Sequence, residues 1–481
     1  MSLSRIPALY AFALFSLLLA GLPAGIARAA DSDGWISLFD GKSLAGWKSR
    51  GAHEAPRVVD GHIVAAGGFG LDYRGGGVPS DLRDFEFQVE VLTKAGGVPL
   101  DAHLPGLRTV GIRIYNSTAQ PESRDDLWKT GSVLRLRPQL KPPSADGRWF
   151  TFRAVVHGRW IRIYTDSSLV ADLIVPWPYT DADRRVPAAL VGFTGRSGAE
   201  TWLRGLRIRP LPAGPTARPL PLDYVDTETQ RLLYEEFPLA DFHIHLKGGL
   251  TLEEALAQSR QKGVFYGIAA NCGIGFPIHD DRGAQEYLKQ LAGQPCFVGM
   301  QAEGREWPRL VSKETIAKFD YIFTDAMTII DHRGRRARLW IKEEVDIPDA
   351  QEFMERLVRT IEDILRHEPV DIYANPTYLP AVLAKDYDRL WTPERQRRVI
   401  RAAAENGVAI EISNSLRLPK PDFIQAAKAA GIRFTLGTNN TDRKLGREEY
   451  GLEMIRRCGL TWQDMWMPKP DGQKPVQVKK P

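Results

Sequence analysis

The sequence predicts two domains of different class, an antiparallel β-sandwich followed by a barrel of alternating strands and helices. Between Trp35 and Leu211, runs such as DFEFQVEVL, WIRIYTD and LRGLRIRPL alternate apolar and polar residues, and Gly, Pro and Asp separate them. This period of two, without a long helical pattern, is typical of a sandwich. After residue 223, short apolar strands alternate with helical stretches of ten or more residues. That rhythm indicates parallel strands joined by right-handed crossovers.

The first 29 residues have the features of a secretory signal peptide. Arg5 precedes the apolar run PALYAFALFSLLLAGL, and Ala27-Arg28-Ala29 resembles a cleavage site. Because both arginines leave with the leader, the formal net charge falls from +5 to +3, which is too small to predict a nucleic-acid partner. No later apolar stretch approaches the roughly 18 residues of a membrane helix. We expect a periplasmic or secreted protein without a membrane span.

Composition also sets the domain boundaries. A proline-rich segment, LPAGPTARPLPLD, separates the two patterns and cannot join the regular structure on either side. The number of cysteines is three, which excludes a disulfide scaffold, although a bridge between Cys272 and Cys296 is conceivable in an oxidising compartment. The expected units are a signal peptide (1–29), a sandwich (32–211), a linker (212–223), a barrel (224–470) and a tail (471–481).

Seven β-then-α units follow the linker, and they close most simply into a barrel of the TIM type or a seven-stranded relative. A charged excursion at 329–349 interrupts them after the fourth strand and could form a lid over the barrel mouth. The predicted barrel strands are LADFHIHL, YGIAANC, CFVGMQAE, DYIFTDAM, DIYANP, AIEISN and RFTLGTN.

The first of these strands carries a candidate site. In DFHIHL, alternation directs Asp241, His243 and His245 to one side and the apolar residues to the other, and we place the polar set inside the barrel. Buried polar side chains need partners, since an unsatisfied one costs roughly 1 to 3 kcal/mol. A divalent cation is one candidate partner, because imidazole and carboxylate are usual ligands. A hydrogen-bonded histidine pair is the alternative.

The carboxyl ends of the other strands should gather around this site, as catalytic groups do in such barrels. They are rich in asparagine, whose amide both donates and accepts and therefore suits a hydroxyl-rich molecule better than a metal ion. From them we select as substrate-binding residues Asn271, Asn375, Glu411, Asn414, Asn439 and Asn440.

Residues 239 to 460 resemble the PHP family, the polymerase and histidinol phosphatase barrels. The HIH at 243–245 matches the opening motif of that family, and GMQAEG places Glu303 where the family has a metal-bridging glutamate. FDYIFTDAM and the run from EISNS through AAKAAGIRFTLGTNNTD resemble its later motifs. The resemblance implies a distorted seven-stranded barrel with a multinuclear phosphoesterase site.

Departures from that family imply that most of the metal site is replaced. At most one divalent cation could remain, on His243, His245 and Glu303, helped by Asp442 or His279. Without it, Glu303, His245 and Asp442 could act as general acid and base on a bound sugar. The positions where the family's ligands are missing are Ala270, Asn271, Cys272, Met327, Asn375, Asn439 and Thr441.

The first domain resembles the 3-keto-disaccharide hydrolase family, a jelly roll found in secreted sugar-processing proteins. The matching stretches include GWISLFDGKSLAGWK, RVVDGHIVA and GRWFTFRAVVHGRWIRIYTDSSLVAD. Independently, alternation predicts one face that carries arginine beside aromatic rings, which suits sugar hydroxyls or carboxylates unless the face is merely solvated. If the strands are adjacent, a ligand or Glu86 and Glu90 must compensate the charge. The predicted face is Arg113, Tyr115, Arg135, Arg137, Arg162 and Tyr164.

These observations lead to one principal hypothesis and two alternatives. The principal one is an exported carbohydrate-active hydrolase that acts on 3-keto-glycosides or related sugars, in which the jelly roll binds or cleaves the glycoside and the barrel is a second, modified hydrolase-like domain. One alternative is a non-catalytic carbohydrate-binding protein with a pseudo-enzyme barrel. The other is a metal-dependent phosphoesterase of the PHP type.

Overall fold

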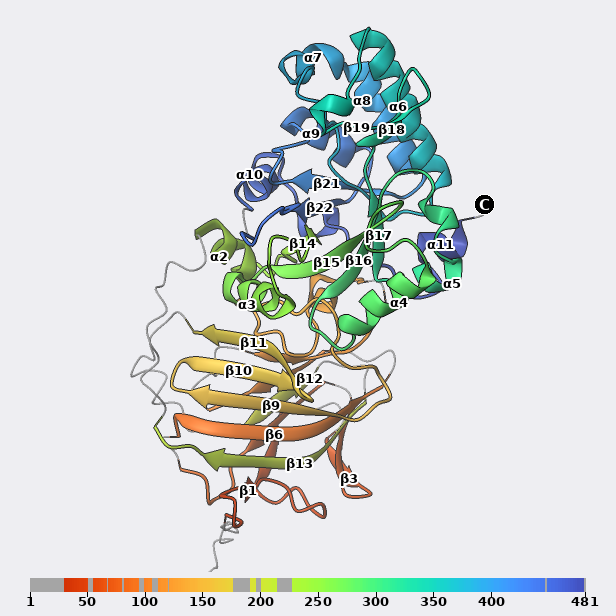
Figure 1. The fold of residues 1–481 in the computed structure, drawn as a ribbon. Coiled ribbons are helices and arrows are strands. Elements are labelled where there is room, and N and C mark those ends of the chain that lie inside the picture. The colour runs from red at the N-terminus through yellow and green to blue at the C-terminus, as the bar shows by residue number, and fades with distance from the viewer. Residues whose placement is uncertain are drawn as a thin grey trace, which may run out of the picture.

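A computed structural model shows the two predicted domains, a β-sandwich followed by a closed parallel barrel (Figure 1). The predicted fold class is confirmed. The signal peptide and all but the first two residues of the predicted linker lie outside the described residues. Within the described residues, no helix is long and apolar enough to span a bilayer. The described ranges are 30–50, 55–66, 68–79, 82–94, 99–105, 111–119, 121–175, 191–195, 200–213, 227–445 and 448–479.

The sandwich consists of two antiparallel sheets. One follows the order β11-β10-β9-β6-β13-β4-β3, with β1 paired to β13, and the other follows β2-β5-β12-β7-β8. The first sheet contains β1 (Ile36–Ser37), β3 (Arg57–Val59), β4 (His62–Ala65), β6 (Asp84–Thr93), β9 (Phe150–His157), β10 (Trp160–Thr165), β11 (Ser168–Ile174) and β13 (Thr201–Pro210). The second contains β2 (Trp47–Arg50), β5 (Phe69–Tyr73), β7 (Leu100–His103), β8 (Ile112–Ile114) and β12 (Gly192–Gly195).

Alternation along the strands explains the sandwich core. In β6, Phe85, Phe87, Val89 and Val91 are fully buried between the sheets, and the residues between them point away from the core. Because the same period recurs in the paired strands, one continuous apolar cluster fills the space between the sheets.

The barrel closes in the order β14-β15-β16-β17-β20-β21-β22, and all its pairs are parallel. Its strands are β14 (Ala240–Ile244), β15 (Phe265–Cys272), β16 (Phe297–Ala302), β17 (Tyr321–Thr324), β20 (Ile372–Tyr373), β21 (Ala409–Ser413) and β22 (Phe434–Gly437). The helices are α2 (Thr227–Tyr234), α3 (Leu252–Lys262), α4 (Asp281–Gln290), α5 (Lys313–Ile316), α6 (Ala350–His367), α7 (Tyr387–Leu390), α8 (Pro393–Glu405), α9 (Pro421–Ala429), α10 (Glu449–Arg457) and α11 (Pro475–Val478).

Strand β14 departs from the strict alternation that the sequence predicts. Its pairing with β15 shifts register between Asp241 and Ile244. The sequence predicts that Phe242 faces the surrounding helices. In the structure its ring packs edge-on against Tyr321, a residue of β17. Tyr321 donates its hydroxyl to the Phe242 carbonyl at 2.6 Å, and a Cβ at Gly267 would come within 2.5 Å of that hydroxyl. Aromatic rings therefore fill the barrel below the histidines.

The excursion after β17 forms a hairpin, β18 (Thr328–Ile330) and β19 (Arg336–Arg338), whose charges pair within it. The segment predicted as a tail packs on the barrel. Lys474 donates to the carbonyls of Ala317 and Phe319 at the end of α5. Lys479 donates to carbonyls at the end of α6. Cations at helix C-termini satisfy orphan carbonyls and complement the helix dipole.

The sandwich docks on the barrel through its edge strand β11, which lies beside α3, and through residues 121–141 (Figure 1). Trp128 is fully buried and donates its indole N–H to the Glu236 carbonyl at 3.1 Å. Lys141 pairs with Asp320, which precedes β17, at 2.7 Å. Since Glu236 and Asp320 both precede barrel strands, the sandwich covers the amino ends of the strands and leaves their carboxyl ends, where the predicted site lies, on the opposite side.

Candidate functional site at the barrel mouth

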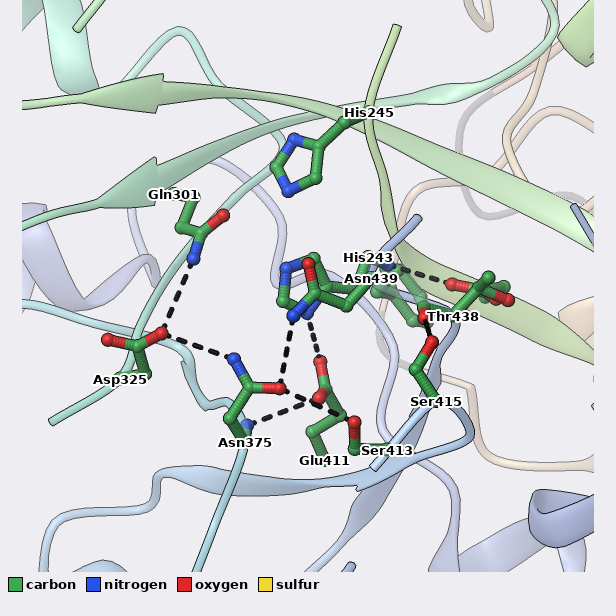
Figure 2. A network of polar contacts seen from close by, with 12 residues as sticks. His243, His245, Gln301, Asp325, Asn375, Glu411, Ser413, Ser415, Thr438 and Asn439 are labelled. Atoms are coloured by element: carbon green, nitrogen blue, oxygen red, sulfur yellow. Dashed lines mark hydrogen bonds and ion pairs between the residues drawn. The ribbon is translucent and has the colours of Figure 1, made fainter. Parts of the chain in front are cut away.

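The two histidines of β14 form the centre of the site. His243 and His245 are 0% and 1% exposed, and their ring centroids are 5.1 Å apart (Figure 2). The His243 Nδ1 lies 2.6 Å from Glu411 Oε2, across the barrel on β21. Both Nε2 atoms are buried without a hydrogen-bond partner among the described residues. The prediction that these imidazoles face the barrel interior is confirmed.

The tautomer of His245 follows from the contact at its Nδ1. Its Nδ1 lies 2.9 Å from the Ala269 carbonyl, which can only accept, so Nδ1 carries the hydrogen. Burial lowers the pKa of His245 well below its usual value, and the neighbouring His243 lowers it further. His245 is therefore neutral at pH 7, with the Nε2 lone pair exposed to the site interior.

Glu303, directly after β16, has the complementary protonation state. Burial raises its pKa to about 8, and the nearby Asp325 carboxylate adds to the increase. One carboxyl oxygen, Oε1, accepts from the Asn271 amide at 2.9 Å, while Oε2 has no partner among the described residues. A pKa of about 8 keeps the carboxyl mainly protonated at neutral pH, and Oε2 is the oxygen that has no partner among the described residues.

A network of amides connects these groups. The Asn271 amide donates to both Gln301 and Glu303. Asp325 accepts from Gln301 at 3.5 Å, from the Asn375 amide at 3.2 Å and from its own loop backbone at 3.0 Å (Figure 2). Both oxygens of Asp325 accept hydrogen bonds, so this carboxyl group positions the amides around it.

Two asparagines of the mouth adopt a backbone conformation that is unusual outside glycine. Asn375 has φ of +46° and Asn439 has φ of +48°. The Asn439 amide donates to the Asn375 side-chain oxygen at 3.3 Å, and Ser413 donates to the same oxygen at 3.4 Å. Asparagine tolerates this region better than most residues, and such strain is often found at binding sites.

Other predicted residues play supporting parts. Asn440 holds the end of β14, since it accepts from the backbone N–H of His245 and donates to its carbonyl, both at 2.8 Å. Asn414 accepts from a backbone N–H of α10 at 2.8 Å. Asp442 is exposed, and its carboxylate accepts from the backbone two residues further on. His279 is exposed as well. The structure does not connect these last two to the network.

Sequence reasoning missed three residues of the mouth. Gln301 precedes Glu303 by two residues on β16, so alternation in VGMQAE could have placed it on the same face. Ser413 stands at the corresponding end of β21. Lys247 lies near enough to Glu303 that its charge lowers the carboxyl pKa, although it follows the strand and no periodicity marks it.

The residues do not form a metal centre of the kind that the PHP resemblance implies. Three potential donor atoms are free, namely both imidazole Nε2 atoms and Glu303 Oε2. However, within the described part of the chain no group of three or more His, Cys, Asp or Glu side chains is placed to hold a cation. Amides occupy much of the mouth, and Glu411 is paired with His243. The three cysteines are all free and buried, so Cys272 and Cys296 do not pair.

The predicted arginine face of the sandwich is wrong as a single surface, because its members lie in different sheets. Arg113, on β8, is 2% exposed and donates to Asp101 at 2.7 Å. Tyr115 lies under the Lys129 ammonium, 4.5 Å from it. Arg135 and Arg137 face the barrel, where Arg137 donates to carbonyls at the end of α3. Only Arg162 and Tyr164 share β10 in the larger sheet.

Comparisons with known proteins found one matching family model and several similar solved structures. Residues 34–209 match the 3-keto-alpha-glucoside-1,2-lyase-like domain family, which covers the first domain only. This match confirms the resemblance seen in the sequence and makes the domain a carbohydrate-related one. None of the curated proteins matches the chain.

Three solved structures illustrate the likeness. A proposed glycosyl hydrolase from Parabacteroides distasonis is 16% identical over 37% of this chain and 95% of its own, with a TM-score of 0.29. A carbohydrate-binding module from Bacillus subtilis is 12% identical over 34% of this chain and 95% of its own, with a TM-score of 0.21. A histidinol phosphate phosphatase from Lactococcus lactis, complexed with zinc, L-histidinol and phosphate, is 14% identical over 50% of this chain and 99% of its own, with a TM-score of 0.38.

Proposed function

We propose that this protein is an exported carbohydrate-active hydrolase whose barrel mouth cleaves a glycoside, with a 3-keto-glycoside as the first substrate class to test. The observation that supports it most is the group of three unpartnered buried atoms, His243 Nε2, His245 Nε2 and Glu303 Oε2. Leaving each unsatisfied costs roughly 1 to 3 kcal/mol, so the site is built for a polar ligand that completes them. The surrounding amides suit hydroxyl groups.

The protonation states suit hydrolysis by general acid and base. Glu303 donates its Oε2 proton to the glycosidic oxygen as the bond from that oxygen to the anomeric carbon breaks. His245 Nε2 takes a proton from water, whose oxygen forms the new bond to the anomeric carbon. The products are a hemiacetal and an alcohol, and the proton on His245 returns to Glu303 through solvent. Asn271 orients Glu303 through its 2.9 Å hydrogen bond.

The carbohydrate class comes from the first domain. Its family match concerns a lyase-like domain for a 3-keto-glucoside, and polar side chains contact one another on its smaller sheet. There Arg50 pairs with Asp72 at 2.7 Å, and His103 lies 3.2 Å from Thr194. In this proposal the first domain indicates the carbohydrate class, and the barrel mouth, on the side of the barrel away from the sandwich, performs the chemistry.

The decisive experiment measures turnover of 3-keto-glycosides and their parent glycosides by the mature chain and by two variants. Glu303→Gln keeps the hydrogen bond to Asn271 and loses the proton, and His245→Gln loses the base. Each should lower kcat by roughly 10²- to 10⁴-fold. Glu286→Gln, on the exposed face of α4, is the matched control and should turn over normally. Full activity in both site variants would refute the proposal and place the chemistry in the sandwich.

The two alternative functions give different results in the same preparations. A non-catalytic sugar-binding protein would retain a glycoside without forming product. A metal-dependent phosphoesterase would release phosphate from a phosphate ester, contain a stoichiometric divalent metal by elemental analysis, and lose that metal in a His243→Ala His245→Ala double variant. Either pattern would replace the proposed activity.

A further inference from the structure

The outer face of the larger sheet carries arginines and aromatic rings that the barrel mouth does not use. Strands β11, β10, β9, β6 and β13 lie side by side in front of the smaller sheet (Figure 1). On β13, the register to β6 shifts between Arg204 and Arg207, and Gly205 adopts φ of +59°. This bulge brings Trp202 and Arg204 before it, and Arg207 and Arg209 after it, to the same outer face.

Each guanidinium on this face stacks on an aromatic ring. Arg153 lies 3.9 Å from the Tyr164 centroid and Arg162 lies 4.4 Å from that of Trp160. The remaining three contacts are made by arginines of β13. The distances to the ring centroids are 4.2 Å for Arg204 on Trp149, 4.4 Å for Arg207 on Trp35 and 4.7 Å for Arg209 on Trp35. Stacking holds a guanidinium flat and leaves its N–H fork directed to the side.

The charges of this arginine face do not balance. Five guanidinium groups stand against four carboxylates of the same face, namely Glu86 and Glu90, Asp84 beside His157, and Asp172, which accepts from the Trp160 indole N–H at 2.6 Å and lies opposite Arg162 in the strand register. Glu86 is bound by Arg153 and Arg209, and Glu90 by Arg204. Although burial raises the pKa of Glu86, hydrogen bonds from its two arginines outweigh it and lower the pKa.

Two guanidinium groups of this face remain without a carboxylate. Among the described residues, neither Arg162 nor Arg207 forms an ion pair, and the buried Nε of Arg162 has no hydrogen-bond partner. Both side chains are partly exposed. The exposed N–H groups of these two side chains, which exclude the buried Nε of Arg162, are therefore available to an external acceptor.

We propose that the arginine face binds an acidic polysaccharide, one with a carboxylate on its sugar units. Planar guanidinium forks bind carboxylates bidentately, and their stacked, preformed orientation reduces the entropy lost on binding. The adjacent strands of the larger sheet offer an extended surface for a chain ligand. The carbohydrate-related family of the domain favours a glycan over a nucleic acid as the polyanion. This binding is independent of the chemistry at the barrel mouth.

The test compares the mature chain with two double variants in binding to polygalacturonate, neutral dextran and a single-stranded oligonucleotide. Arg162→Gln Arg207→Gln removes the two unpaired forks without breaking a described ion pair. Arg282→Gln Arg359→Gln removes two charges from exposed barrel helices and is the matched control. We expect the mature chain to prefer polygalacturonate to dextran, and the first variant to weaken polygalacturonate binding by roughly tenfold or more. The polygalacturonate affinity of the control should stay within about twofold of that of the mature chain, a change well below the loss expected from removing one guanidinium contact.

A third variant, Arg162→Lys Arg207→Lys, keeps the charge and loses the forks, so it should bind polygalacturonate less tightly than the mature chain. Equal binding of dextran, or equal weakening in the control, would overturn the proposal. So would an oligonucleotide that binds as tightly as polygalacturonate, since that marks a non-specific cationic surface. Glycoside turnover measured alongside separates this inference from the proposed function, because Glu303→Gln should lower turnover and leave polygalacturonate binding intact.

Discussion

At the scale of single residues, burial decides the chemistry of the mouth. Glu303 is protonated at neutral pH because it is buried next to Asp325, and His245 is neutral because it is buried beside His243. An exposed glutamate would be ionised at neutral pH, and an exposed histidine would be partly protonated. The acid and the base are therefore products of their surroundings rather than of residue type.

The pH dependence of turnover follows from Glu303. The carboxyl must be protonated to act as an acid, so activity is present below its pKa of about 8 and falls as pH rises through that value. We expect kcat to decline above pH 8 in the mature chain. The alkaline limb should be missing from the residual activity of Glu303→Gln. A profile that is flat to pH 10 would show that Glu303 is not the acid.

Asp371, away from the mouth, makes the protein less stable at neutral pH. Burial raises its pKa to about 6, while one oxygen accepts from the Ile322 N–H at 3.0 Å. A raised carboxyl pKa means that the folded state binds the proton more tightly, so stability falls as pH rises from about 4 to 6. Two pKa units correspond to about 3 kcal/mol.

The matching measurement is denaturant unfolding of the mature chain and of Asp371→Asn at pH 4 and pH 7. The amide does not ionise, so the unfolding free energy of the variant relative to the mature chain should rise by about 3 kcal/mol between the two pH values. A constant difference would mean that Asp371 titrates normally in the folded protein.

At the scale of elements, the sequence pattern and the structure agree where periodicity is local. Helix α3 illustrates this, since Thr251 and Glu254 form the capping box at its start and Gly263 ends it with φ of +72°. Its last carbonyls, however, are satisfied from the other domain. Arg137 donates to Arg260 and Gln261 at 2.7 and 3.1 Å. No local pattern predicts a cap that is supplied across a domain boundary.

Replacing Arg137 should therefore weaken α3 and the domain contact together. Arg137→Ala removes charge-assisted hydrogen bonds and leaves buried carbonyls unpaired, which should cost roughly 2 to 4 kcal/mol of unfolding free energy. Arg137→Lys should recover only part of this, because an ammonium cannot reproduce the fork. Arg282→Ala, on the exposed surface of α4, should have no measurable effect in the same denaturant titrations.

At the scale of the whole molecule, the sandwich and the barrel share a continuous apolar cluster. Leu127, Trp128 and Leu140 of the sandwich pack with the barrel core, and ion pairs and hydrogen bonds surround them. This contact covers the end of the barrel away from the site. The sandwich therefore supports the barrel without obstructing its mouth.

We expect this contact to couple the unfolding of the two domains. Trp128→Ala should remove roughly 3 to 5 kcal/mol, a typical cost for truncating a buried aromatic residue, and should split one calorimetric transition into two. Trp340→Ala, at an exposed position on the excursion, is the control and should leave one transition. Two transitions in the unmodified protein would show that the domains unfold independently.

The sequence by itself determined the class and order of the elements, the inward histidines and the place of Glu303 at a strand end. Each depends on side-chain periodicity along one strand or helix, and that periodicity is local. Tertiary structure alone decided the rest: the partner of each imidazole, the protonation of Glu303, the bulge that gathers the arginines, and the docking through Trp128. These depend on burial and on residues distant in the chain, whose effects on charge and pairing no local pattern contains.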